Sequence, residues 1–285
     1  MIVVTGATGA LNGATVDHLL EHVPATEVVV AVRDRAKARR FADRGVQVRR
    51  ADYADPSSLP AAFEGADQLL LVSSNAPGVD TVPLHRNAVE AAVAAGAGRV
   101  LYTSHQGAAL DNPFAPGRVH AATEQLLADS GLAWTSLRNG FYAHTLGWLA
   151  GSWRQEHRIT VPADGPVSWT AREDAAEAAA VVLLSDRALD GPLTLTAPEA
   201  PTFTDVAATA SELAGREVVL EVVDPEDWVA AQVAAGRPEA AARFTLGIFT
   251  GAAHGFFAGT DPLLGELLGR APRTVRDVLA ERPAA

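Results

Sequence analysis

Hydrophobic and polar positions alternate between two patterns along the first 140 residues. Short apolar runs rich in Val and Leu are typical of strands buried on both faces of a parallel sheet. Between them, apolar residues recur at the spacing of helices packed on such a sheet. We predict strands over residues 2–5, 27–32, 46–49, 68–72, 99–103 and 134–137, separated by helices over residues 10–22, 36–43, 56–63, 82–95 and 119–129. This alternation predicts a Rossmann-like, doubly wound parallel α/β domain over residues 1–140.

The pattern changes after residue 140, where helical spacing dominates. We predict helices over residues 142–151, 172–185, 203–214, 225–235 and 238–257, with short strands at 193–195 and 217–222. Four of the five tryptophans fall in this part of the chain: Trp148, Trp153, Trp169 and Trp228. We therefore expect a smaller, mostly helical substrate-binding lobe over residues 141–285, interleaved with the first domain.

Composition narrows the class of protein. The chain has 285 residues, of which 48% are hydrophobic, so it can bury a sizeable core. Its net charge of −11 argues against a nucleic-acid partner, because phosphates would be repelled. The absence of cysteine excludes disulfides and thiol nucleophiles and fits a cytoplasmic protein. No apolar run approaches the ~20 residues that span a bilayer, and the scattered histidines lack the spacing of metal ligands, so neither a membrane nor a metal is expected.

The segment "VVTGATGALNG" at residues 3–13 carries the first chemical signal. Gly6 permits a tight turn after the first strand, and Gly9 lets the backbone approach a pyrophosphate. The N-terminus of the following helix supplies unpaired N–H groups and the positive end of its dipole. We predict a dinucleotide-binding turn formed by Gly6, Thr8, Gly9, Ala10, Leu11 and Asn12.

Asn12 departs from the usual pattern, in which a third glycine stands at this place. It shares a helical face with Val16 and Leu19 and should point toward the sheet or the cofactor cleft, while Gly13 is expected off that face. The Asn12 amide either donates to a phosphate or fills the space that a phosphate needs. We expect dinucleotide binding to be retained but weakened.

Arg33 stands at the end of the second predicted strand. An acidic residue there would hold a ribose 2′-hydroxyl, whereas an arginine suits a 2′-phosphate, so the sequence favours NADPH. The alternative, a solvated helix face, fits the nearby Arg39 and Arg40 better. Asp34 either caps the next helix or touches a ribose.

Further polar residues follow the third and fourth strands. Asp52 and Tyr53 lie where an adenine ring would bind. Ser73, Ser74 and Asn75 would lie above the nicotinamide ribose, at the carboxyl edge of the sheet.

Several motifs together resemble the NmrA-like atypical short-chain dehydrogenases. They are "TGATG" at 5–9, "VRD" at 32–34, "ADYAD" at 51–55, "YTS" at 102–104, "HAATEQLLADSGL" at 120–132 and "LRNGFY" at 137–142. The later "SWTAREDAAEAAAVVL" and "LLGRAPRTVRDVL" extend the resemblance over nearly the whole chain. It implies hydride transfer from NADPH to a quinone or similar acceptor, although the family also includes a co-regulator that binds dinucleotide without turnover.

The resemblance also raises a question about catalysis. Short-chain dehydrogenases typically use a Tyr, a Lys four residues later and a Ser on the preceding strand. Ser104 keeps the place of that serine, whereas counting back from Glu124 puts His120 at the Lys position and Pro116 at the Tyr position. A quinone accepts hydride readily, so solvent can protonate the product. His120 could then hold the nicotinamide ribose, donate a proton or merely pack.

Residues after the sixth strand complete the candidate site. Tyr142 is either a second proton donor or pocket lining, and Arg138 either contacts the cofactor or forms a structural ion pair. A substrate wall for a flat apolar ligand is predicted from aromatic residues that could instead be core between the two lobes; they are Phe141, Tyr142, His144, Trp148 and Trp169.

Two functions remain open at this point. One is an NADPH-dependent reductase of a quinone or related conjugated carbonyl compound, with specialised metabolism as one setting and a homodimer as one assembly. The other is a non-redox or dinucleotide-sensing protein that kept the fold and lost turnover. Asn12 and Pro116 favour the second.

Overall fold

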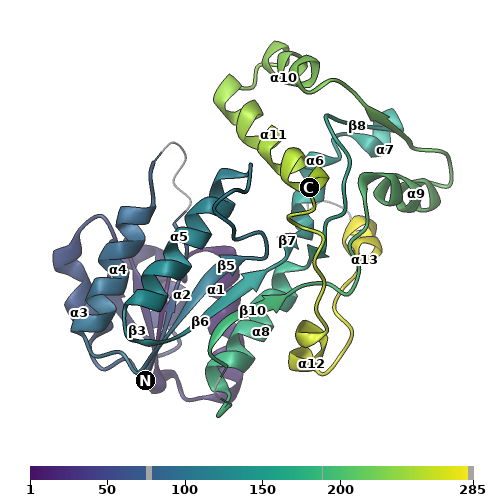
Figure 1. The fold of residues 1–285 in the computed structure, drawn as a ribbon. Helices are drawn as coiled ribbons and strands as arrows, with labels where there is room; N and C mark the ends of the chain where they lie inside the picture. Colours follow the sequence, from purple (N-terminus) through teal and green to yellow (C-terminus); the bar gives the residue numbers. More distant parts are fainter. Residues whose placement is uncertain (75–78, 188, 282–285) are drawn as a thin grey trace.

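A seven-stranded sheet forms the body of the protein, in a computed structural model that describes residues 1–74, 79–187 and 189–281. All its strand pairs are parallel, in the order β10-β6-β5-β4-β1-β2-β3 (Figure 1). The strands are β1 (Ile2–Thr5), β2 (Val28–Val32), β3 (Gln47–Arg50), β4 (Gln68–Leu71), β5 (Arg99–His105), β6 (Ala133–Asn139) and β10 (Gly191–Leu195). Strands β2 and β3 are added on one side of β1, and β4, β5 and β6 on the other. The strand order therefore reverses between β1 and β4, and α/β proteins bind ligands at such a point. The predicted Rossmann-like fold is confirmed.

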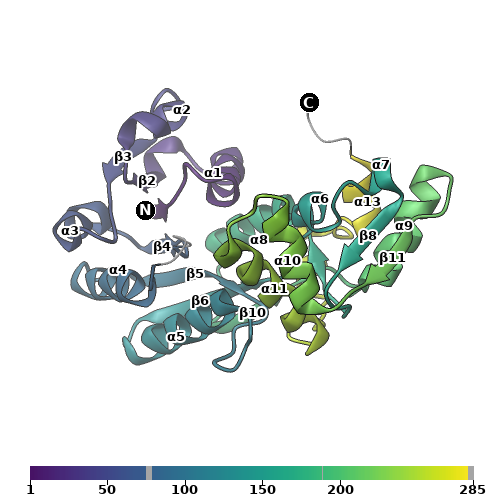
Figure 2. The same cartoon turned by 90° about the horizontal axis from the view of Figure 1, so that it is seen from above.

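Helices cover both faces of this sheet (Figure 2). One face carries α1 (Ala10–His22), α8 (Arg172–Leu184) and α12 (Leu263–Leu268), and the other carries α3 (Leu59–Phe63), α4 (Val82–Ala94) and α5 (Ala115–Asp129). Successive residues of β1 point to opposite layers, so Val4 packs in the core with Leu19 of α1 while Val3 packs with Phe63 of α3. This double burial explains why the strands read as continuous apolar runs.

Individual residues explain where two of the helical segments begin. The helix expected over 119–129 begins at Ala115 instead, because Pro116 is well tolerated in a first turn, where its missing N–H costs nothing. The helix expected over 36–43 is a short 3₁₀ turn, η2 (Arg35–Ala38), followed by α2 (Arg39–Ala42). Asp34 caps η2, since its Oδ1 accepts from the Ala36 N–H at 3.0 Å.

The second part of the chain is a smaller, mostly helical lobe, as predicted. Its helices are α6 (Leu146–Leu149), α7 (Trp153–Glu156), α9 (Phe203–Ala214), α10 (Pro225–Ala234), α11 (Glu239–Ala253) and α13 (Val275–Ala280). Two parallel strand pairs join them: β7 (Phe141–Tyr142) with β9 (Trp169–Thr170), and β8 (Arg158–Val161) with β11 (Val219–Val222). Short 3₁₀ turns complete the described elements: η1 (Ala25–Glu27), η3 (Pro56–Ser58) and η4 (Ala143–Thr145).

The two parts interleave along the chain. The strand expected at 193–195 within the lobe is β10, which pairs with β6 in the main sheet, and α8 packs against α1. The chain enters the lobe again and then returns through α12. Asp174 anchors this return, because its fully buried carboxylate accepts from Arg270 Nη2 at 2.9 Å and from the Arg273 N–H at 2.7 Å. The domain division at residue 140 stays a prediction.

None of the helices in the described ranges is long and apolar enough to cross a bilayer.

The contact between α1 and the preceding turn corrects one expectation. Gly13 was expected off the inward face, but it is buried beside Asn12. A methyl group on Gly13 would lie 2.9 Å from the Ala7 carbonyl oxygen and 2.8 Å from Arg40 Nη2. Asn12 and Gly13 lie on either side of the contact between α1 and the turn, so both are buried. Gly13 allows the helix backbone to approach the Ala7 carbonyl closely.

We predict that Gly13→Ala destabilises the protein by about 1–3 kcal/mol, because overpacking against a backbone carbonyl outweighs alanine's better helix propensity. Urea unfolding measures the change. Gly147→Ala in α6 is the matched control, since nothing lies within 4 Å of its added methyl group. Equal gains in stability for both variants would refute the close-approach role.

Candidate functional site

The turn between β1 and α1 is built to receive a ligand. Gly6 adopts φ +64°, and a methyl group there would lie 2.6 Å from Val72 Cγ1, so only glycine fits. Gly9 is the N-cap of α1 and donates its N–H to the Gly6 carbonyl at 2.9 Å. No described side chain caps this helix, and Thr8, Gly9 and Ala10 are exposed. The N–H groups of the first turn therefore remain available to an anion.

Asn12 lies inside the fold. Its side chain is 1% exposed, and Nδ2 donates to the Thr5 carbonyl at 2.9 Å. Oδ1 has no partner among the described residues. The amide thus ties α1 to the end of β1, and this geometry gives no support to the alternative in which it donates to a phosphate. Leu11, half-buried beside it, contributes backbone to the same turn.

Arg33 follows β2 at the same edge of the sheet, where the Gly6 N–H donates to the Ala31 carbonyl. It is exposed, and within the described ranges no carboxylate lies within 4.0 Å of it. Its neighbour Arg40, in contrast, pairs with Asp17 at 2.8 Å. Arg35 and Lys37 are also exposed, but Arg33 is the basic residue that directly follows β2, and it is available to an anionic ligand beside the glycine turn.

Tyr53 belongs to a hydrogen-bond network beneath this edge. Its hydroxyl lies 2.7 Å from Thr5 Oγ1, which also donates to the Leu70 carbonyl and accepts from the Val72 N–H. The Tyr53 hydroxyl must therefore donate to Thr5, and burial raises the pKa of the phenol. Asp52 is half-exposed, with Oδ1 accepting from the Ala54 N–H at 3.0 Å. Contacts of Asp52 and Tyr53 with adenine remain a prediction.

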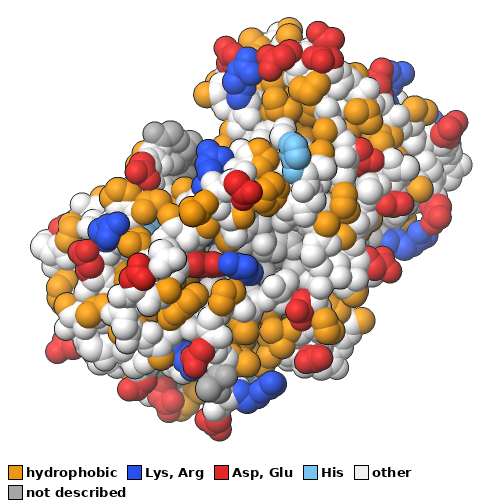
Figure 3. Space-filling view, viewed as in Figure 1, with side chains coloured by type: hydrophobic (Ala, Val, Ile, Leu, Met, Phe, Trp, Pro, Cys, Tyr) orange, Lys and Arg blue, Asp and Glu red, His pale blue; other side chains and the backbone are white. Residues whose placement is uncertain are grey.

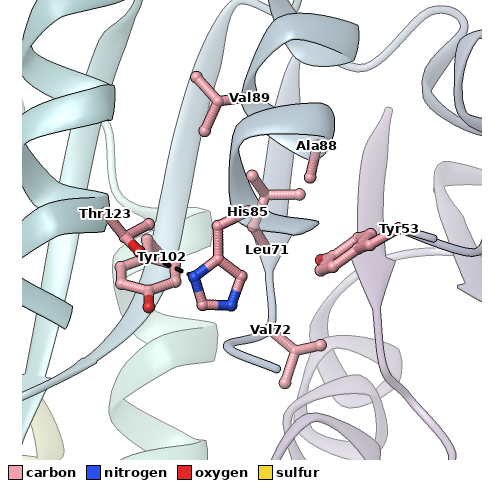
Figure 4. Close-up of a pocket in the computed structure, with 8 residues that line it drawn as sticks. All are labelled: Tyr53, Leu71, Val72, His85, Ala88, Val89, Tyr102 and Thr123. Atoms are coloured by element: carbon pink, nitrogen blue, oxygen red, sulfur yellow. Dashed lines mark hydrogen bonds between the residues drawn. The ribbon is translucent and has the colours of Figure 1, made fainter. Parts of the chain in front are cut away.

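His85 holds the segment that follows β4. Its Nε2 accepts from the Ser74 N–H at 2.7 Å, so the proton must lie on Nδ1, which donates to Thr123 Oγ1 at 2.7 Å. The ring is 2% exposed, between Tyr102 and Tyr53 (Figure 4). Burial lowers its pKa to about 4.

The same segment is fixed a second time at Ser73, whose N–H donates to Thr103 Oγ1 at 2.8 Å. The structure thus brings Ser73 and Ser74 to the carboxyl edge of the sheet, as predicted. Asn75, the third residue predicted there, lies outside the described residues. His85 was not predicted from the sequence, although its place in the first turns of the next helix was a usable signal.

Ser104 does not face an open site. It is 4% exposed, and its hydroxyl donates to Glu124 Oε1 at 2.7 Å. Ser136 donates to the same oxygen at 2.6 Å, and Arg138 binds the carboxylate through Nε and Nη2. The ion-pair alternative for Arg138 is therefore realised, and Glu124 raises the pKa of its guanidinium. This geometry gives no support to a catalytic Ser104 hydroxyl.

His120 lies in a second cluster, at the carboxyl end of β5. Its Nδ1 is 2.9 Å from the Tyr102 hydroxyl. Its ring is stacked with that of His105, with centroids 6.1 Å apart and planes inclined by 21°. Burial lowers the pKa of His105 to about 4 and holds that of His120 well below its usual value. Both imidazoles are therefore neutral at pH 7. His105 and Tyr102 were not predicted, although both lie in or beside "YTS".

The five predicted wall residues are not brought together. Trp169 is 1% exposed and packs on Phe141 with ring centroids 5.5 Å apart, so both belong to the core of the lobe. Trp148 is 45% exposed and lines a different hollow of about 480 Å³, with Trp228 and Arg237.

Tyr142 and His144 form a stacked pair, with ring centroids 5.7 Å apart. The Tyr142 hydroxyl accepts from Asn139 Nδ2 at 3.2 Å, and burial raises its pKa to about 12. His144 is exposed. The Tyr142 side chain is half-buried. The outline of the molecule is indented between body and lobe (Figure 3).

In the part of the chain that the structure describes, no group of three His, Asp or Glu side chains could hold a metal ion.

Comparisons with known proteins identify the family and the fold of the chain. A family described as NAD(P)H-binding matches residues 6–186. Quinone oxidoreductase 2 of Escherichia coli strain K12 is 36% identical over 281 residues, covering 97% of this chain and 96% of that protein. The NmrA-like family domain-containing oxidoreductase flvB of Aspergillus flavus is 31% identical, with 98% of this chain and 93% of that protein covered.

Solved structures show the same similarity. The crystal structure of the Escherichia coli NADPH-dependent quinone oxidoreductase complexed with NADPH superposes with a TM-score of 0.92 at 34% identity, covering 98% of this chain and 99% of that one. The Citrobacter sp. triphenylmethane reductase complexed with NADP(H) gives a TM-score of 0.90 at 32% identity, again covering 98% and 99%.

The buried neutral His85 predicts a pH dependence of stability. Its folded pKa of about 4 lies below its unfolded value near 6.5, so the unfolded state binds more protons in between. Stability is therefore lost as pH falls through this range, by about 2 kcal/mol between pH 7 and pH 5. The Asp80 carboxylate opposes the shift but is the smaller effect.

Unfolding free energies of the natural protein and His85→Gln, measured from pH 5 to pH 7, test this. Glutamine offers an acceptor and a donor but does not titrate. The decrease in unfolding free energy between pH 7 and pH 5 should therefore be about 2 kcal/mol smaller in the variant than in the natural protein. The other buried histidines contribute equally to the pH dependence of both proteins, so their effect cancels in the comparison. An unchanged slope would contradict the assigned neutral state.

Proposed function

The chain belongs to the NAD(P)H-binding, NmrA-like family, and on this premise we propose that it is an NADPH-dependent reductase of quinones or related conjugated carbonyl compounds. The observation that carries the cofactor part is Arg33, exposed beside an intact glycine turn. A fork of guanidinium donors matches a phosphate in charge and shape.

The residues present fit a dinucleotide. Its pyrophosphate would sit on the N–H groups that open α1, where the uncapped Gly9 leaves the backbone accessible. Its 2′-phosphate would meet Arg33, and Ser73 and Ser74 would border the nicotinamide ribose. When bound, the reduced nicotinamide supplies a hydride. In this binding mode the buried Asn12 side chain does not contact the cofactor.

The absence of the usual catalytic tyrosine supports a quinone-like acceptor. Pro116 carries no proton to give, and the Ser104 hydroxyl is held by Glu124. A quinone takes up hydride without prior protonation, and solvent protonates the product. Quinone oxidoreductase 2 of Escherichia coli and the Citrobacter triphenylmethane reductase are named for electron-poor acceptors of this kind, which accept hydride without prior protonation. Specialised metabolism remains one setting for such an activity.

The second candidate is a dinucleotide-sensing protein without turnover. It is favoured by the same loss of the Ser–Tyr–Lys constellation and by Asn12, whose unpartnered Oδ1 lies inside the turn region. Turnover, and not cofactor affinity, separates the two candidates.

Arg33→Ala should weaken NADPH binding by about 1.5–3 kcal/mol, because one charge-assisted phosphate contact is lost, and should leave NADH binding nearly unchanged. Calorimetric titration of both cofactors measures this. Arg39→Ala is the matched control, since Arg39 is 84% exposed on the solvated face. Equal affinity of the natural protein for NADPH and NADH would contradict the assignment of Arg33.

Reductase activity is tested by adding a panel of quinones to the protein with NADPH, without oxygen, and following the nicotinamide absorbance. We expect one NADPH consumed per quinone reduced, and no consumption when the quinone or the protein is omitted. Tight NADPH binding with no turnover across the panel would favour the sensing protein.

A further inference from the structure

Two imidazole side chains form an unusual pair at the junction of body and lobe. His105 ends β5, and His120 lies on α5, one turn after Pro116. Their rings are stacked, and each uses its Nδ1 within the fold. Which nitrogen carries the proton decides what each ring offers to a ligand.

The tautomer of His105 follows from one backbone contact. The Gly107 N–H donates to His105 Nδ1 at 3.0 Å, so this nitrogen carries a lone pair. The proton of the neutral ring must then lie on Nε2. Phe114, Phe141 and Phe257 hold the ring, with centroids between 5.2 and 6.1 Å away.

The tautomer of His120 follows from the Tyr102 phenol, which is 1% exposed. A buried hydroxyl must donate its proton, and the described acceptor is His120 Nδ1 at 2.9 Å. Within the described ranges, no second hydrogen bond of the Tyr102 hydroxyl meets the same geometry. His120 therefore also carries its proton on Nε2.

Both Nε2–H groups are left for a ligand. Neither donates to a residue in the described ranges, and neither is among the described buried atoms that lack a partner, so both reach solvent. Each ring is half-buried, which reduces competition from water. The pair thus presents two preoriented N–H donors at the carboxyl edge of the sheet.

We propose that His105 and His120 together bind the substrate oxygen on which negative charge develops during reduction, with Tyr102 as the residue that positions His120. This inference rests on the proposed reductase function. Hydride transfer would break a C–H bond of the reduced nicotinamide and form an O–H bond at one quinone oxygen, which leaves the hydroquinone monoanion with its charge on the other oxygen. The charge lies on oxygen until a proton from solvent neutralises it. Preoriented donors stabilise such an anion more than the ground-state carbonyl.

Two acceptors of different charge separate this role from general positioning. A naphthoquinone becomes an anion when it accepts hydride, whereas the cationic dye malachite green becomes neutral and places no charge on oxygen. His105→Phe keeps an aromatic ring but removes the donor. It should lower kcat/KM for the quinone by about 10- to 100-fold and change that for the dye by less than about threefold. His105→Gln, which restores an N–H, should recover part of the quinone rate.

His120→Phe and Tyr102→Phe should show the same selectivity, with a smaller effect for Tyr102→Phe, because its His120 ring remains. His22→Phe on the exposed end of α1 is the matched control for a histidine change far from the pair. Circular dichroism checks that each variant folds. Parallel losses with both acceptors, or no loss with the quinone, would overturn the proposal.

Nitrogen-15 NMR of histidine-labelled protein tests the pair even if no acceptor is reduced. We expect the Nε2–H tautomer for both rings in the natural protein, and a mixture for His120 alone in Tyr102→Phe. Titration with para-nitrophenolate, a stable oxyanion, should shift both Nε2 resonances. An Nδ1–H tautomer or unshifted resonances would overturn the proposal, whereas these shifts without any turnover would count against the proposed reductase function alone.

Discussion

The Glu124 carboxylate is the interaction on which the functional edge depends. It accepts hydrogen bonds from Ser104 on β5 and from Ser136 and Arg138 on β6, and so fixes α5 to two neighbouring strands. Removing one partner of a buried ion pair costs about 3–5 kcal/mol; the cost is smaller here because Arg138 keeps 29% of its side chain exposed. Because His120 lies on the same helix one turn earlier, its distance from the end of β5 is set by this carboxylate.

Around that anchor, uncharged groups position the rest of the edge. Thr5 joins β1, β4 and Tyr53, whereas Thr103 and His85 hold the backbone after β4. Each of these groups is satisfied by named partners, so this part of the edge is held in place by neutral hydrogen bonds. Arg33 places a positive charge at one side of the edge, where an anionic cofactor would bind. An acidic protein thereby keeps one locally positive approach to its cleft.

What the sequence could predict depends on whether a feature is local. The glycine turn, the central strands and the place of Arg33 follow from short patterns, since strand, turn and helix are consecutive. The positions of α8 and β10 in the body required long-range pairing with α1 and β6. Aromatic residues showed the same limit, because Trp148 and Trp169 look alike in sequence but are 45% and 1% exposed. The pairing of His105 with His120 was equally hidden, since it spans the β5–α5 connection.

Pro116 and His120, which stand at the usual tyrosine and lysine positions, can both be explained by a quinone acceptor. A catalytic tyrosine protonates an alkoxide, which is too basic to leave an enzyme unprotonated. A hydroquinone anion is far less basic, so a pair of neutral N–H donors is enough to stabilise it. Partial burial of His105 among Phe114, Phe141 and Phe257 lowers its pKa and keeps the imidazole neutral well below pH 7. In the proposed reductase, loss of the tyrosine and the presence of two half-buried histidines are therefore two parts of one arrangement, in which the protein supplies hydrogen bonds and solvent supplies the proton.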